Sequence, residues 1–201
     1  MSDSLPNDLT EARFLDAGAT RAATAAWART QGETAGVVVL PLWVADIADA
    51  LASANATVGS VIGWPFGAST AQAKAIDAAT AAADGAQELT VFVNLAALKS
   101  GLDSLILDEI QGVVDMCAPA GVAVRVALDL SQLAGKERSM LATLAADAGA
   151  DAIVLIGGGE TEVNDLSEIV GDDVAIVVWD PPADIDDDAL LEAGAARIAR
   201  A

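Results

Sequence analysis

Short, nearly continuous apolar runs recur along the chain and are separated by longer stretches of mixed polarity. Runs of this length and composition predict parallel strands that are covered on both faces. A weaker first strand is expected near Ala12–Leu15 and a last one at Ala196–Ala199. The six clear runs are Val37–Leu40, Val58–Ile62, Leu89–Asn94, Val122–Leu128, Ala152–Ile156 and Val174–Trp179.

Helices are expected in the stretches between these strands. The clearest spans Thr70–Asp84, with Ser69 as its N-cap, Gln72 completing a capping box and Gly85 ending it. Further helices are predicted at Trp43–Ala54, Ser104–Cys117 and Lys136–Ala148.

Three Gly-Ala joints, at Gly85, Gly149 and Gly194, each follow a helical stretch and precede an apolar run or the chain end. Such joints suit the helix-to-strand corners of a parallel α/β protein. Up to eight strands in 201 residues predict one small (β/α)₈ TIM barrel over residues 11–201, after a flexible segment at 1–10, with no room for a final helix. The competing doubly wound sheet lacks the dinucleotide fingerprint after its first strand.

Composition limits the cellular compartment and the classes of binding partner that we expect. No apolar run reaches the ~20 residues of a membrane span, and the acidic N-terminus, Met1–Asp8, lacks the order of a signal peptide. The single cysteine, Cys117, excludes an internal disulfide. A net charge of −20 disfavours nucleic acid and anionic membranes as partners. We therefore expect an acidic, soluble, cytoplasmic protein.

Histidine and tyrosine are absent from the chain. Histidine-based acid–base catalysis, histidine metal ligation and any Ser-His or Cys-His triad are therefore excluded within it. The remaining catalytic side chains are Asp, Glu, Lys, Cys, Ser and Thr.

Two segments carry a specific resemblance to a known family. Gly59–Thr70 (GSVIGWPFGAST) and Val93–Gly101 (VNLAALKSG) resemble the third and fourth strands, with their loops, of deoxyribose-phosphate aldolases. Supporting similarity runs through Gly121–Arg138, Ala148–Gly159 and Asp173–Arg197. The resemblance implies a class I aldolase barrel, a lyase that cleaves 2-deoxyribose 5-phosphate to acetaldehyde and glyceraldehyde 3-phosphate through a lysine imine.

The catalytic positions of that family fall on residues that cannot perform its chemistry. Its Schiff-base lysine falls on Val154, its second lysine on Val177 and its proton-relaying aspartate on Thr90. Its phosphate-binding turns are replaced by Trp179-Asp180-Pro181-Pro182 and by the chain end after Arg197. Because valine has no amine to attack a carbonyl, the resemblance implies a scaffold that has lost its imine mechanism.

Other chemistry is expected at the C-terminal ends of the strands, where barrel enzymes work. The residues expected there are Asp16, Asn94, Asp129, Glu160 and Asp180. Of these, Asp129, Glu160 and Asp180 are the candidate ligands for a hard divalent cation; the alternative is a set of solvated loop acids.

The same end of the barrel has two further candidate features, a phosphate-binding turn and a lysine nucleophile. Gly157, Gly158 and Gly159 present amides to a phosphate or simply form a tight turn. Lys99 is the one lysine expected near the mouth, as Lys74 and Lys136 are expected to face solvent, but a hydrated lysine is a poor nucleophile.

The remaining notable side chains have packing interpretations. Cys117 is expected in the core and the four tryptophans are expected to be packing groups, although Trp179 is a candidate to plug the former active-site mouth.

Three functions follow. The leading hypothesis is a pseudoenzyme that acts as a binding or subunit-type protein; its rivals are an aldolase with a relocated lysine, Lys99, and a metal-assisted enzyme using the acidic mouth. No cofactor is expected. A small-molecule ligand and a homo- or hetero-oligomer are the partners left open.

Overall fold

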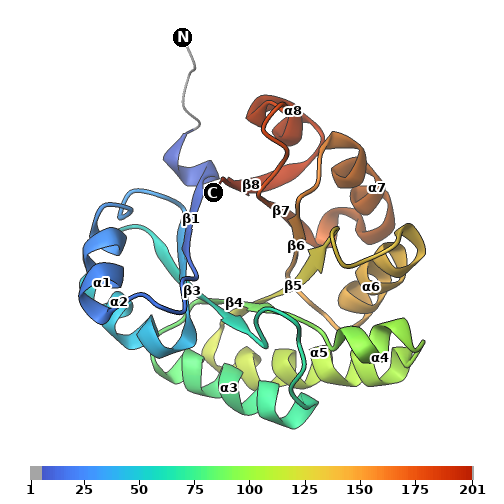
Figure 1. Ribbon diagram of the computed structural model, residues 1–201, viewed down its shortest axis with the longest axis horizontal. Helices are drawn as coiled ribbons and strands as arrows, with labels where there is room; N and C mark the ends of the chain where they lie inside the picture. The colour runs from blue at the N-terminus through green and yellow to red at the C-terminus, as the bar shows by residue number, and fades with distance from the viewer. Residues whose placement is uncertain (1–5, 201) are drawn as a thin grey trace.

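The computed structural model describes residues 6–200, which form a ring of eight parallel strands surrounded by helices (Figure 1). The strands follow one another in chain order from β1 to β8. A parallel bridge between Thr10 and Ile198 joins the two ends of the ring. The strands are β1 (Glu11–Phe14), β2 (Gly36–Val39), β3 (Thr57–Ile62), β4 (Glu88–Val91), β5 (Ala123–Asp129), β6 (Ala152–Ile156), β7 (Ala175–Trp179) and β8 (Ala195–Ala199).

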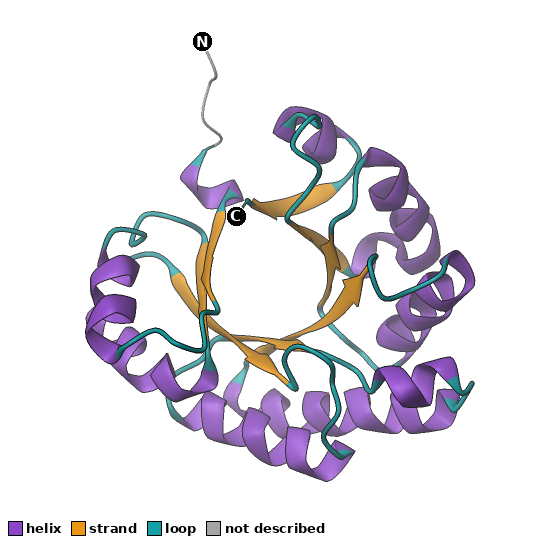
Figure 2. Cartoon of the chain, in the orientation of Figure 1, coloured by secondary structure: helices purple, strands orange, loops and turns teal. Residues whose placement is uncertain are grey.

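Helices lie outside the ring, between successive strands (Figure 2). They are α1 (Arg21–Arg29), α2 (Val44–Ala50), α3 (Ala71–Ala83), α4 (Leu95–Lys99), α5 (Asp103–Cys117), α6 (Gly135–Asp147), α7 (Glu160–Val170) and α8 (Asp187–Glu192). Four 3₁₀ turns lie at Asn7–Leu9, Pro41–Trp43, Ala118–Ala120 and Gly171–Asp173. The predicted (β/α)₈ barrel is confirmed.

The Gly-Ala joints end their helices as expected. Gly85, Gly149 and Gly194 have φ values of +103°, +77° and +108°, in the region that favours glycine. Each glycine lies two residues beyond the last residue of α3, α6 or α8, and the chain then turns into the next strand.

Two details of the helices differ from the expectation. The hydroxyl of Thr70, not Ser69, caps α3 by accepting from the amide of Ala73 at 3.3 Å, which moves the capping position one residue beyond the expected one and removes the role assigned to Gln72. The predicted helix at Trp43–Ala54 ends early, at Ala50. Residues 1–5 of the segment expected to be flexible lie outside the described residues, and its Asn7–Leu9 forms a 3₁₀ turn.

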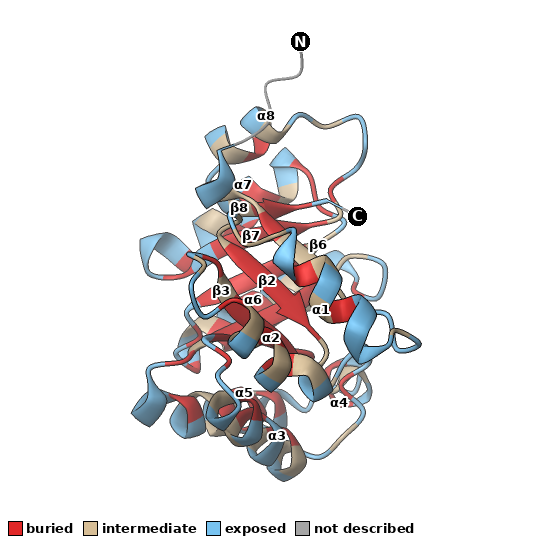
Figure 3. Ribbon diagram, turned by 90° about the vertical axis from the view of Figure 1, so that its left-hand side faces the viewer, coloured by how far each residue is buried: buried red, intermediate tan, exposed pale blue. Residues whose placement is uncertain are grey.

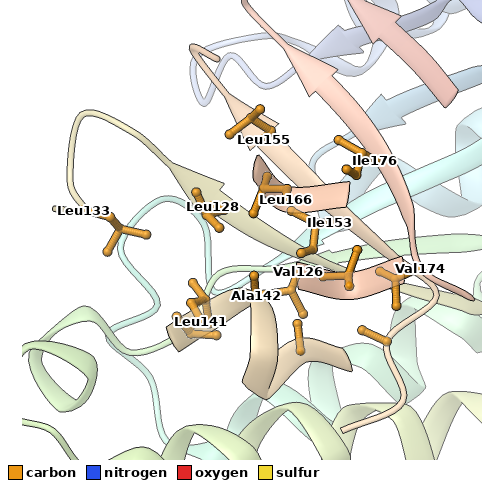
Figure 4. Packing of buried hydrophobic residues seen from close by; sticks show 14 of the residues in the cluster. Val126, Leu128, Leu133, Leu141, Ala142, Ile153, Leu155, Leu166, Val174 and Ile176 are labelled. Carbon is orange, nitrogen blue, oxygen red and sulfur yellow. The ribbon is translucent and has the colours of Figure 1, made fainter. Parts of the chain in front are cut away.

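The outer core lies between the sheet and the helices. Figure 3 shows buried strands inside helices whose outer faces are exposed. Side chains of β5 to β7, such as Leu128, Ile153 and Leu155, pack with Leu141 of α6 and Leu166 of α7 (Figure 4). These residues alternate along their strands with residues that point into the barrel, so both faces of the strands are covered.

The expectation that Lys74 faces solvent is wrong, because its side chain is fully buried. Its ammonium donates to Glu109 of α5 at 2.5 Å and to the carbonyl of Phe92 at 2.8 Å. Burial lowers the pKa of Lys74 and raises the pKa of Glu109, while the contact between them opposes both shifts. Glu109 also accepts from the amide of Asn94 at 3.1 Å, so the pair fixes the chain where it leaves β4.

We expect Lys74→Met to lower the free energy of unfolding by about 3–5 kcal/mol, because it leaves the buried Glu109 carboxylate without its partner. The double variant Lys74→Met/Glu109→Leu removes both charges and should recover much of that loss. Urea unfolding measures both effects. The control is Lys136→Met, an exposed lysine on α6, expected to change stability by no more than about 0.5 kcal/mol. A Lys74→Met protein as stable as the parent would contradict the ion-pair interpretation.

Candidate functional site

Val154 and Val177, the valines that the resemblance is expected to place at the family's two lysine positions, lie side by side inside the barrel. Val154 of β6 is paired in register with Val177 of β7, and their side chains are 0% and 3% exposed. Both belong to one apolar cluster, the inner apolar layer, which fills the barrel interior. Its buried members are Val38, Val61, Phe92, Ala127, Val154, Val177, Trp179 and Ala199.

Trp179 occupies the barrel interior beside the valines and is 0% exposed. Its indole N–H donates to the Oε1 atom of Glu11 at 2.6 Å. The guanidinium carbons of Arg13 and Arg125 lie 4.8 Å and 5.8 Å from the centre of its ring, within cation–π range. A large aromatic ring is thus held in place by one hydrogen bond and two cations.

Four charged residues lie inside the barrel beneath this ring, and we call them the inner charge cluster: Glu11, Glu88, Arg125 and Arg197. The Nη1 atom of Arg125 lies 2.6 Å from Glu11 and 3.0 Å from Glu88. Arg197 contacts Glu88 at 2.7 Å. Two cations therefore face two anions, and the cluster is formally neutral.

The cluster also contacts Thr90, the residue predicted to fall on the family's proton-relay position. Burial disfavours the charge of Arg125, but Glu11 and Glu88 outweigh this effect and the pKa of Arg125 lies above its usual value. Its Nε donates to the hydroxyl of Thr90 at 3.1 Å. Thr90 is fully buried and hydrogen-bonded to this cation.

Sequence reasoning missed the inner charge cluster. A signal was present, because Arg125 lies within a predicted apolar strand and Glu88 directly precedes another. Charged residues in buried strands require a partner of opposite sign. The partner could not be named, since these residues meet only when the sheet closes.

The carboxylates expected around the mouth make mostly local contacts. Asp16 accepts from the amide of Gly18 at 2.7 Å, and Asp129 accepts from the amide of Ser131 at 2.8 Å. Glu160 is the first residue of α7, and Asp180 contacts Arg13 at 2.5 Å. Among residues 6–200, no three acidic or cysteine side chains are grouped in a way that could hold a metal ion.

The other residues of the candidate ligand site also make hydrogen bonds or packing contacts within the chain. Asn94 caps α4 by accepting from the amide of Ala97 at 3.1 Å. The amide of Gly157 donates to the carbonyl of Trp179 at 2.8 Å, and that of Gly159 donates to Glu162 at 3.1 Å. A Cβ atom on Gly158 would lie 2.3 Å from the side chain of Leu155. Packing and the tight turn therefore account for the glycine triplet.

All three lysines lie on helices, so none occupies a strand position facing the barrel interior. Lys99 is 48% exposed, and its ammonium donates to the carbonyl of Gln132 at 2.7 Å and to Glu137 at 3.3 Å. The amide of Ala134 and the nearby Lys99 lower the pKa of Glu137. Lys99 therefore forms a surface ion pair between α4 and α6.

No helix within residues 6–200 is both long enough and apolar enough to cross a membrane. Cys117, as expected, is buried in the outer core, where burial raises the pKa of its thiol.

Known proteins resemble the chain in sequence and in structure. No protein-family model matches it. A protein named deoxyribose-phosphate aldolase from Enterococcus faecalis is 34% identical over 169 residues, which cover 81% of this chain and 76% of that protein. This relationship covers most of both chains.

Solved structures share the fold. A protein described as "QR15, an Aldolase" has a TM-score of 0.87 at 22% identity, over 100% of this chain and 92% of that one. The deoxyribose phosphate aldolase from Aeropyrum pernix, described as a unique tetramer, has a TM-score of 0.83 at 23% identity, over 96% and 85% of the two chains. Together with the sequence identity to the Enterococcus protein, these observations show that the chain belongs to the deoxyribose-phosphate aldolase family.

Proposed function

We propose that this chain is a member of the family that does not perform lysine-imine cleavage and instead acts as a binding or subunit-type protein. One observation carries the proposal: Val154 and Val177, which fall on the two lysine positions, are paired and buried inside the barrel. An imine needs a free amine within reach of the substrate carbonyl, and neither side chain has one.

The surroundings of the valines support the same conclusion. Thr90 has no carboxylate to relay a proton, and its hydroxyl accepts a hydrogen bond from Arg125. Trp179 fills space beside the valines and packs against them. A substrate carbonyl would have to displace this ring to approach Val154. Binding at the mouth, by contrast, needs no entry into the barrel.

The names of the relatives favour the alternative of an active lyase on a phosphorylated deoxysugar. That alternative needs a relocated lysine, and Lys99 is the candidate from the sequence. Its ammonium is exposed and paired with Glu137, which favours the charged, non-nucleophilic form. The metal-assisted alternative would have to gather Asp129, Glu160 and Asp180, which make separate contacts.

A subunit-type role implies assembly with other chains. The Aeropyrum relative is described as tetrameric, which supports a homo-oligomer for this chain. Mass measurement in solution tests this part of the proposal independently of any activity.

Incubation with deoxyribose 5-phosphate and borohydride should add no stoichiometric mass to the protein, because no lysine faces the barrel interior to form a reducible imine with bound substrate. Intact-mass spectrometry checks this, with an active family member as the positive control. A stoichiometric adduct would overturn the proposal, and its disappearance in Lys99→Ala would assign the chemistry to the relocated lysine.

Val154→Lys should not restore aldolase activity and should lower the free energy of unfolding by roughly 2–5 kcal/mol, since an ammonium would be buried without a partner. Val154→Met is the matched control, because it adds similar length without charge and separates overpacking from desolvation. Thermal or urea unfolding and an acetaldehyde-release assay give the two readouts. A stable, active Val154→Lys protein would show that the sixth-strand register has been misassigned.

A further inference from the structure

Arg13 lies at the mouth of the barrel with an incomplete set of hydrogen bonds. Its side chain is 12% exposed, and its guanidinium stacks on the ring of Trp179 at 4.8 Å. Its Nη2 atom donates to Asp180 at 2.5 Å. Its Nε atom is buried and has no acceptor among the described residues.

The partner of Arg13 has an unusual backbone. Asp180 directly follows β7 and has a φ of +50°, the only positive φ of a non-glycine among residues 6–200. Its amide donates to the carbonyl of Ala199 at 2.8 Å, which holds the backbone against β8. Left-handed backbone is unfavourable for residues with a Cβ atom, although Asp and Asn adopt it more readily than the others. Strain of this kind collects at functional positions, here at the end of a barrel strand.

We propose that Arg13 forms an oxyanion-binding site at the barrel mouth and that the Asp180 carboxylate is its internal occupant, displaced when a small phosphate- or carboxylate-bearing ligand binds. This inference deepens the binding role proposed above and rests on it. Asp180 satisfies one donor of Arg13, whereas an incoming oxyanion with two free oxygens satisfies Nη2 and Nε together. Because Nε is buried while Asp180 is in place, the ligand reaches it only after that carboxylate swings aside.

The contacts around Arg13 favour this exchange. Trp179 fixes the guanidinium plane, so little conformational freedom is lost on binding. The nearest acids along β1 and its loop are already occupied, Glu11 by Arg125 and Trp179 and Asp16 by the amide of Gly18. The Asp180 side chain is 41% exposed, which gives it room to move into solvent.

The net charge of −20 lowers the affinity for anions that we expect of the parent protein. A negative surface repels anions, but this effect is screened beyond about 8 Å at physiological ionic strength. Both this repulsion and competition from Asp180 weaken binding in the parent protein. Removal of the competing carboxylate should therefore strengthen it.

Asp180→Asn is the decisive variant, because asparagine has nearly the same shape and tolerates left-handed backbone. Inorganic phosphate and acetate are titrated separately at constant ionic strength, and the ¹H–¹⁵N signal of the Arg13 Nε–H group is followed. We expect at least one of the two anions to bind about tenfold more tightly to Asp180→Asn than to the parent. The anion that binds identifies whether phosphate or carboxylate is the preferred class.

The double variant Arg13→Gln/Asp180→Asn should lose this binding. If it does not fold, the Arg13 Nε–H signal in Asp180→Asn alone still decides the matter, because that signal must shift and saturate with the anion. An unchanged signal with both anions, or equal affinity in the parent and in Asp180→Asn, would overturn the proposal. Neither residue takes part in the borohydride test, so failure here leaves that result standing.

Discussion

The inner charge cluster is the constraint on which the barrel interior depends. Glu11 contacts Arg125 and Trp179, so one carboxylate on β1 links β5 and β7 across the ring. Glu88 joins Arg125 to Arg197 and brings in β4 and β8. Loss of one member leaves buried charge unpaired, which typically costs about 3–5 kcal/mol. The position of Trp179, and through it that of Arg13, follows from this network.

The same network is the reason we expect one substitution not to restore the family's chemistry. An imine-forming lysine needs a second cation nearby to keep its amine neutral, a proton relay and space for substrate. Here Val177 stands at the second position, Thr90 is hydrogen-bonded to Arg125, and Trp179 packs into the interior. Because the interior of a barrel is close-packed, a change at one of these residues requires its neighbours to change as well.

Features set by neighbouring residues were predictable from the sequence, whereas contacts that form only when the sheet closes into a barrel were not. Apolar runs placed the strands to within a few residues, and Gly85, Gly149 and Gly194 marked the corners, because both signals arise from neighbouring residues. Lys74 was misplaced, since helical position alone does not show which face meets Glu109 on a helix far along the chain. The pairing of Val154 with Val177 was not predicted, because the resemblance only assigned them to family positions on two strands, whereas the place of Trp179 at a strand end suggested a plug.

The mouth of the barrel shows what kind of chemistry such an interior leaves open. Asp16 and Asp129 make hydrogen bonds within their own loops, so they shape the rim without linking the strands. The contact between Arg13 and Asp180 differs, because it joins β1 to the end of β7 above the ring of Trp179. Covalent catalysis requires a nucleophile inside the barrel, but recognition of an anion requires only a fixed positive charge at its rim. A sealed interior is therefore compatible with ligand binding, and the residue that seals it, Trp179, is also the one that holds Arg13 in position.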